Sequence, residues 1–210
     1  MYFRIILYTI CLGLSSFLYA QKMDIPSQKI LSILEKNYLS GSPALFKFSF
    51  YAAKKDDNKK ELGTLYTSGN KYRLKIKDME QIFDGKKIYN ISSEDKEITI
   101  AKSDENEMVV SPLSYLDLYK KNYTARYIGK KKLNGKILDH ILLRPIQPNE
   151  TKEISLYIAD KKLLERIEEI SKDGSIRTTE IINYQPKVKF PPNFFSFQKN
   201  NYKGYLITEL

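Results

Sequence analysis

Few residues in this chain have side chains suited to catalysis. His140 is the only histidine and Cys11 is the only cysteine. A zinc site needs three or four nitrogen, sulfur or carboxylate ligands, so here it would have to use three carboxylates, an unusual set. A nucleophile likewise needs a base placed beside it. This inventory predicts no metal centre and gives no support for covalent catalysis.

The remaining chemical signals agree with that prediction. Acidic residues fall in expected loops, as in Asp56-Asp57 and around Asp104 and Glu107, which is typical of solvated turns. The sequence has no GxGxxG, Walker or GxSxG pattern. His140 lies inside an expected strand, where a lone histidine usually has a structural role. We therefore expect a protein that is not an enzyme and needs no cofactor.

The first twenty residues have the layout of a secretory signal. Residues 1–4 include a basic arginine, residues 5–19 are almost wholly apolar or small, and Ala20-Gln21 is a plausible cleavage site. The apolar run is shorter than the roughly 20 residues that a spanning helix needs. We expect residues 1–20 to be a cleaved signal peptide and residues 21–210 a single exported domain. An uncleaved membrane anchor is the alternative.

The cysteine content and the charge limit the chemistry and the partners expected of an exported chain. Cys11 lies within the apolar run, so the mature chain would have no cysteine and no disulfide. The formal net charge is +10, but the lysines are spread over turns and strand faces instead of forming one footprint. We therefore expect no nucleic-acid partner. Attraction to an anionic membrane surface and a merely solvated basic face both remain open.

The periodicity of the chain predicts a mainly β fold. Residues 22–43 are expected to form a helix and its exit, with Ser27 as the candidate N-cap, and residues 111–121 a second, short helix. Between and after them, short alternating segments follow one another, separated by turns such as Asp84-Gly85 and Asn134-Gly135. About eleven strands at this even spacing indicate a sandwich or a barrel. The expected strands are 45–53, 61–68, 71–77, 80–83, 86–91, 96–101, 123–130, 136–145, 153–159, 163–169 and 176–184, with a further β-prone stretch at 205–207.

The aromatic content suggests what such a barrel could hold. The chain has sixteen tyrosines, ten phenylalanines and no tryptophan. These side chains could simply fill a barrel core. Alternatively, a barrel with too few side chains to fill it holds an apolar ligand.

Read in order, the segments resemble the periplasmic outer-membrane lipoprotein carrier family (LolA-like). The resemblance begins with the N-terminal helix and the phenylalanine-rich strand 46–50. It continues through Gly63-Thr64-Leu65-Tyr66, the strand that starts Tyr72-Arg73-Leu74, and the turn Asp84-Gly85-Lys86 with the aromatic strand after it. The helix at Pro112, the Asp173-Gly174 hairpin and the closing Phe195-x-Phe197 follow in family order. The likeness covers nearly all of the mature chain.

The resemblance implies a fold and a function. The fold would be an incomplete antiparallel barrel of about eleven strands, with the N-terminal and middle helices as a lid over an apolar cavity. The protein would be a monomeric periplasmic chaperone that accepts acylated lipoproteins from an inner-membrane ABC transporter. It would then deliver them to the outer membrane, in some bacteria to an anchored acceptor of similar fold.

The same resemblance, combined with strand alternation, predicts the residues of the site. The acyl-chain cavity would be lined by Phe46, Phe48, Phe50, Tyr66, Tyr72, Leu74, Ile76 and Ile88. The lid would consist of Ile30, Leu31, Leu34, Leu113 and Leu116. Arg73 and Lys75, which alternate with the cavity residues of their strand, are expected to point to solvent.

One departure from the family pattern keeps other cargoes open. Many members have an arginine that ties the lid shut just before the turn leading into the aromatic-Arg strand, whereas here that position is Ser68 or its neighbour Gly69. The alternative function is therefore a carrier of a free lipid, a glycolipid or a pigment intermediate. A third hypothesis is a structural or protein-binding β domain with a filled core.

Overall fold

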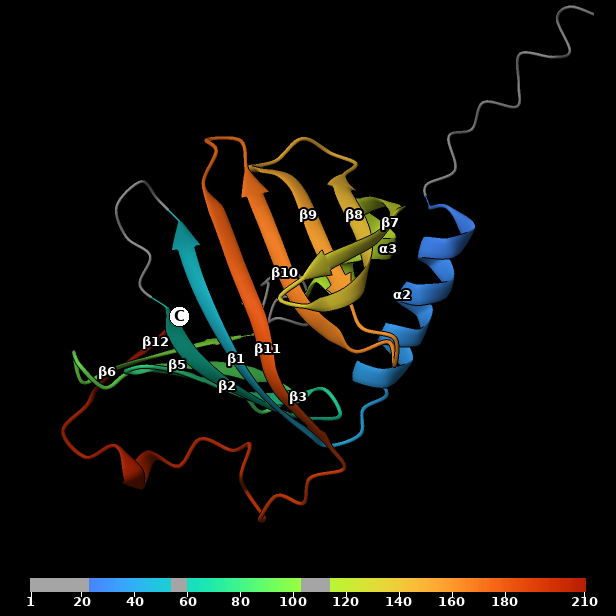
Figure 1. The fold of residues 1–210 in the computed structure, drawn as a ribbon. Helices are drawn as coiled ribbons and strands as arrows, with labels where there is room; N and C mark the ends of the chain where they lie inside the picture. The colour runs from blue at the N-terminus through green and yellow to red at the C-terminus, as the bar shows by residue number, and fades with distance from the viewer. Residues whose placement is uncertain (1–22, 54–59, 103–113) are drawn as a thin grey trace, which may run out of the picture.

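A computed structural model describes residues 23–53, 60–102 and 114–210 (Figure 1). Within these ranges it contains two α-helices, a short 3₁₀ turn and twelve strands. The helices are α2 (Ile25–Tyr38) and α3 (Ser114–Asn122), and the 3₁₀ turn is Lys199–Asn201. The strands are β1 (Ala44–Ala53), β2 (Glu61–Ser68), β3 (Lys71–Ile76), β4 (Met79–Phe83), β5 (Lys87–Ser92), β6 (Glu97–Lys102), β7 (Tyr123–Leu133), β8 (Lys136–Pro145), β9 (Thr151–Ile158), β10 (Leu164–Ser171), β11 (Ile176–Pro186) and β12 (Leu206–Glu209).

All the strands belong to one open sheet. Their order is β12-β6-β5-β4-β3-β2-β1-β11-β10-β9-β8-β7, so β12 and β7 are the two edges and do not pair with each other. Neighbours are antiparallel except β12 and β6, which are parallel. The pairing of β1 with β11 joins the two halves of the sheet. Figure 1 shows that β2–β6 run across the direction of β8–β11, so the sheet is strongly bent. The predicted incomplete barrel is confirmed, and β12 adds a strand to the expected number.

The N-cap of the N-terminal helix lies three residues before the predicted one. Asp24, not Ser27, is the N-cap, and its Oδ1 accepts a hydrogen bond of 2.8 Å from the backbone N–H of Ser27. Pro26 explains the earlier start, because proline is favoured in the first turn, where its missing N–H leaves no bond unmade. The other carboxylate oxygen of Asp24 accepts from the N–H of Tyr127 at 2.8 Å, which ties the start of α2 to β7.

The β7–β8 hairpin shows how turn chemistry sets the register. Asn134 and Gly135 have φ values of 49° and 77°, and Leu133 pairs directly with Lys136. Positive φ at both central residues is the requirement of a two-residue type I′ turn, and Asn-Gly is its preferred sequence. The turn predicted from that dipeptide is confirmed.

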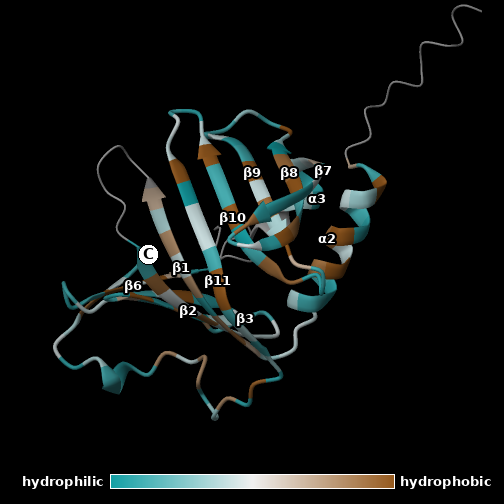
Figure 2. Ribbon diagram, viewed as in Figure 1, coloured by the Kyte–Doolittle hydropathy of each residue, from teal (hydrophilic) through white to brown (hydrophobic). Residues whose placement is uncertain are grey.

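Strand alternation gives the sheet two unlike faces, which we call inner and outer. The inner face carries the main core and is covered by α2 and α3; in Figure 2 the ribbon of α2 is banded with hydrophobic and hydrophilic residues, and its buried hydrophobic residues belong to this core. The outer face of β7–β11 is largely polar. Within the described residues, no helix is long and apolar enough to cross a membrane.

The outer face of β4–β6 has a second, smaller core. Ile82, Ile91 and Ile98 are buried there beneath Phe197 and Tyr202 of the chain that follows β11. This C-terminal segment, residues 187–210, crosses the outer face and ends as β12 (Figure 1).

The C-terminal segment also corrects an expectation about β3. The side chain of Arg73 is only 19% exposed and donates from Nη1 to the carbonyl oxygen of Phe194 at 3.0 Å. It faces away from the main core, as alternation requires, but it does not reach open solvent. Lys75 is 49% exposed, as expected. The sequence pattern identified the correct face but could not show that this face is covered.

Candidate functional site

The predicted cavity residues lie mostly on the inner face, at the junction between the halves of the sheet. Phe46 and Phe48 on β1, Tyr72 and Leu74 on β3, and Ile88 on β5 are all buried. Phe50 and Ile76 are half-buried and pack against the main core. Period-two alternation put these residues on one face, and the bend of the sheet turns that face toward α2 and α3.

Tyr66 is the exception, and its assignment to the cavity is wrong. It lies on the outer face, where its ring packs edge-on against Phe194 with centroids 5.0 Å apart and against Phe190 at 5.9 Å. Its neighbour Leu65 is the inward residue, 1% exposed and paired with Phe46 on β1 and with Leu74 on β3. The family pattern favoured the aromatic residue Tyr66. The strand register instead pairs Leu65 with the inward Phe46, and paired residues share a face.

The two helices cover this face with the predicted side chains. Leu31 and Leu34 are fully buried, Ile30 is 8% exposed and Leu116 is 2% exposed. Leu113 lies outside the described residues. Tyr119 was not among the predicted lid residues, although its spacing placed it on the same side of the middle helix as Leu116. It is 1% exposed, one helical turn after Leu116.

Polar contacts fasten the helices at a few points. Lys120 of α3 forms an ion pair of 2.6 Å with Glu35 of α2, and the hydroxyl of Tyr119 donates to the same carboxylate at 3.4 Å. Burial, reinforced by Glu35, raises the pKa of Tyr119 to about 12. On the other side of α2, the hydroxyl of Tyr38 accepts from the backbone N–H of Leu164 at 2.8 Å. Burial raises the pKa of Tyr38 to about 12, so both phenols stay protonated at physiological pH.

A backbone contact lies where the resemblance would place the arginine that closes the lid. Ser68 ends β2, and the N–H of Gly69 in the following turn donates to the carbonyl oxygen of Gly41 at 2.9 Å. Gly41 is in the exit loop of α2. This bond connects the helix exit to the β2–β3 turn without any charged side chain.

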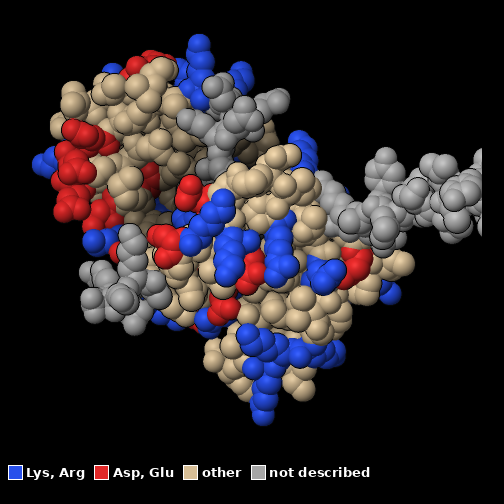
Figure 3. All heavy atoms as spheres, turned by 90° about the horizontal axis from the view of Figure 1, so that it is seen from above, with Lys and Arg blue, Asp and Glu red and all other residues tan. Residues whose placement is uncertain are grey.

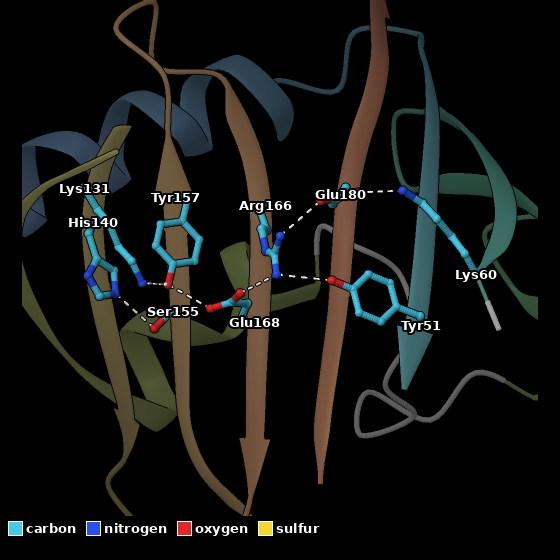
Figure 4. Close-up of polar contacts among 9 residues, drawn as sticks. All are labelled: Tyr51, Lys60, Lys131, His140, Ser155, Tyr157, Arg166, Glu168 and Glu180. Atoms are coloured by element: carbon cyan, nitrogen blue, oxygen red, sulfur yellow. Dashed lines mark hydrogen bonds and ion pairs between the residues drawn. The ribbon is translucent and has the colours of Figure 1, made fainter. Parts of the chain in front are cut away.

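A separate polar network crosses the outer face from β7 to β1 (Figure 4). Arg166 is its centre and contacts the carboxylates of Glu168 at 2.5 Å and Glu180 at 3.1 Å. Glu180 also pairs with Lys60 at 2.8 Å, and the hydrogen bond from that lysine contributes most to lowering the pKa of Glu180. The hydroxyl of Tyr157 donates to Glu168 at 2.8 Å. The network links successive strands of the bent sheet.

His140 lies at one end of this network. Its Nε2 is 3.0 Å from the hydroxyl oxygen of Ser155, and its ring stacks on Tyr157 with centroids 4.8 Å apart. Burial, together with the charge of Lys131, lowers the pKa of His140, so the imidazole is neutral at pH 7. Ser155 is 9% exposed and lies within the paired part of β9, where backbone N–H groups are used by the sheet and not free to stabilise an oxyanion. The arrangement favours a structural role for the pair.

Charge is unevenly distributed over the surface. In the view from above, lysine and arginine side chains gather across the middle and lower part of the visible face, and aspartate and glutamate side chains are most numerous toward its left side (Figure 3). Among the residues that the structure describes, no group of three or more histidine, cysteine, aspartate or glutamate side chains is arranged to hold a metal ion.

Comparison with known proteins identifies the fold. No family model matches the sequence, and no curated protein matches it. An uncharacterized conserved protein from Thermus thermophilus aligns with a TM-score of 0.63 at 12% identity, over 88% of this chain and 99% of that chain. A DUF1329 family protein from Desulfovibrio piger aligns with a TM-score of 0.51 at 7% identity, over 85% of this chain and 98% of that chain.

A third structure aligns with a lower score. A LolA superfamily protein from Nitrosomonas europaea aligns with a TM-score of 0.43 at 9% identity, over 81% of this chain and 97% of that chain. The fold itself is clear from the strand order and the helices. It is the architecture that the sequence predicted, an open and mostly antiparallel sheet with an N-terminal and a middle helix on its inner face.

Proposed function

We propose that this protein is a periplasmic carrier that shields the acyl chains of lipoproteins against the inner face of its sheet. The observation that carries the proposal is the composition of that face. From β1 to β3 it presents Phe46, Phe48, Leu65 and Leu74, and its cover is a pair of helices instead of a second sheet. Helices fastened at a few points can move aside, whereas a paired strand cannot move without breaking its ladder.

The energetics of the cargo favour such an arrangement. Three acyl chains contain on the order of 40 methylenes, and each methylene exposed to water costs about 0.8 kcal/mol. A carrier must therefore cover the chains, yet it must release them where no ATP is available. An apolar face under movable helices meets both requirements, because the helices can close over the face again when the cargo leaves.

The proposed route begins at an inner-membrane ABC transporter and ends at the outer membrane. The sequence supports export through its N-terminal signal-like segment, and the protein would act as a monomer without cofactor or enzymatic activity. The alternative cargo, a free lipid, glycolipid or pigment intermediate, would use the same face. The two cargo classes differ in whether a polypeptide is attached to the acyl chains.

That difference provides the test. The protein is purified from a periplasmic extract without detergent, and the material bound to it is analysed by mass spectrometry. We expect acylated polypeptides whose N-terminal residue carries the chains. Recovery of lipids without polypeptide would replace the lipoprotein cargo with the alternative. Recovery of no acylated molecule at all, from protein that is folded and abundant, would contradict the carrier function.

A further inference from the structure

A line of polar side chains interrupts the apolar inner face on β4, β5 and β6. Leu74 of β3 pairs with Gln81, Gln81 pairs with Asn90, and Asn90 pairs with Thr99. Directly opposed residues in a sheet point to the same face. Since Leu74 belongs to the main core, Gln81, Asn90 and Thr99 also point inward. All three are half-buried.

Hydrogen bonds fix the orientation of the side chains in this line. The hydroxyl of Tyr72 donates to Oε1 of Gln81 at 2.8 Å, and Nε2 of Gln81 donates to Oδ1 of Asn90 at 2.6 Å. Each group donates toward β5, so the chain of bonds ends at the amide hydrogens of Asn90. In the part of the chain that the structure describes, no group accepts a hydrogen bond from Nδ2 of Asn90. Bonds in such a chain polarise one another, which strengthens the last donor.

Apolar residues lie next to Asn90, so an amide hydrogen of Asn90 that is covered there without an acceptor is destabilising. Ile88 is the next inward residue on the same strand and is 5% exposed. Phe83 is the residue opposite Ile88, and its ring lies 5.5 Å from that of Tyr72, centroid to centroid. A polar group kept away from water without a partner is destabilising, so a cargo that covers this region must supply an acceptor.

The charges nearby define the kind of acceptor. The inward residues of β3–β6 include no lysine or arginine, because the basic residues Lys71, Arg73 and Lys75 occupy the outward positions of β3, and Lys87 and Lys102 those of β5 and β6. A phosphate or carboxylate would enter this face without a counter-ion, which is unfavourable. The neutral amide of Asn90 is therefore suited to donate to a neutral carbonyl oxygen.

We propose that Asn90 binds the carbonyl oxygen of an ester or amide through which an acyl chain is attached to the cargo, while the chain itself lies on the neighbouring apolar residues. This inference rests on the proposed carrier function and adds the class of ligand that the carrier takes. It would bind chains that are joined through a carbonyl in preference to alkyl ethers or free fatty-acid anions. Acylated cysteine and diacylglycerol both offer such carbonyls.

The test compares an ester and an ether that differ only in the carbonyl, together with an acylated peptide. Displacement of a bound apolar dye is measured with dipalmitoylglycerol, with its dialkyl ether analogue, and with a tripalmitoyl-cysteine peptide. One hydrogen bond to a polarised donor predicts that the ester binds roughly tenfold more tightly than the ether. The Asn90→Leu variant removes the donor and should bind ester and ether alike. Asn90→Asp keeps the oxygen that accepts from Gln81 but lacks the amide hydrogens, so it should also lose the preference.

The outcomes separate this inference from the proposed function. Equal binding of ester and ether by the unaltered protein, or an unchanged preference in a folded Asn90 variant, would overturn the role of Asn90 and leave the carrier function standing. Failure to bind the dye or any acylated probe would instead reject the carrier function. If the ester preference holds, tighter binding of the tripalmitoyl peptide identifies acylated polypeptide as the source of the carbonyl, and tighter binding of dipalmitoylglycerol identifies a free lipid.

Discussion

Replacing Leu116 with glutamate is expected to lift α3 from the inner face while the sheet stays folded. Leu116 is 2% exposed within the main core, so the new carboxylate would be buried without a partner. The strand ladder does not pass through α3, and we expect the free energy of unfolding to fall by about 2–4 kcal/mol. The opened face should take up more apolar dye in the empty protein and retain acylated cargo less well.

A substitution on the same helix provides the control. Asn122 is exposed at the end of α3, so Asn122→Glu adds the same charge without burying it. It should change neither dye uptake nor cargo release. Complete unfolding of Leu116→Glu would assign Leu116 to the part of the core on which the whole fold depends. Unchanged dye uptake and retention in a folded Leu116→Glu protein would show that α3 is not a lid.

Replacing Gly63 with alanine is expected to disturb the inner face from within the sheet, not from the helices that cover it. Gly63 pairs with Phe48, and a Cβ added to Gly63 would lie 2.2 Å from Cζ of the Phe48 ring. Since Phe48 is 3% exposed, its ring can move only by pushing into the neighbouring core. Overpacking of this kind costs about 1–3 kcal/mol, measured as a shift in the denaturation midpoint. The displaced ring should also weaken binding of acylated probes.

The double variant Gly63→Ala with Phe48→Leu tests the cause. The smaller leucine leaves room for the methyl group, so the double variant should be more stable than the sum of the two single effects predicts. Additive effects would mean that the glycine is needed for a reason other than the ring of Phe48.

Alternation and turn chemistry predicted most of the fold, because both are local. Asn134-Gly135 specified its own hairpin, and Phe46 and Phe48 identified the buried face of their strand. The strand expected at 163–169 is present as β10 (Leu164–Ser171). Such features depend on residues that are close together in the sequence.

What the sequence could not predict depends on contacts between distant segments. The cover over Arg73 comes from Phe194, which is far along the chain, and no local pattern signals that contact. Tyr66 was assigned to the wrong face because an aromatic motif outweighed the register that selects Leu65. The inward line of Gln81 and Asn90 appears only when the pairing of β4 with β5 is known. The outer network around Arg166 likewise needs the order of β9, β10, β11 and β1.

The most direct test of the central claim is to find where an acyl chain lies when it is bound. A palmitoyl ester carrying a photoreactive group at the end of its chain is bound to the full protein, irradiated, and the labelled peptides are sequenced by mass spectrometry. The carrier function predicts labels on inward residues such as Phe48, Phe50 and Leu74, lost when an excess of unlabelled ester is present. Labels confined to the outer face, at Tyr157 or Tyr202, or labels that unlabelled ester does not displace, would contradict it.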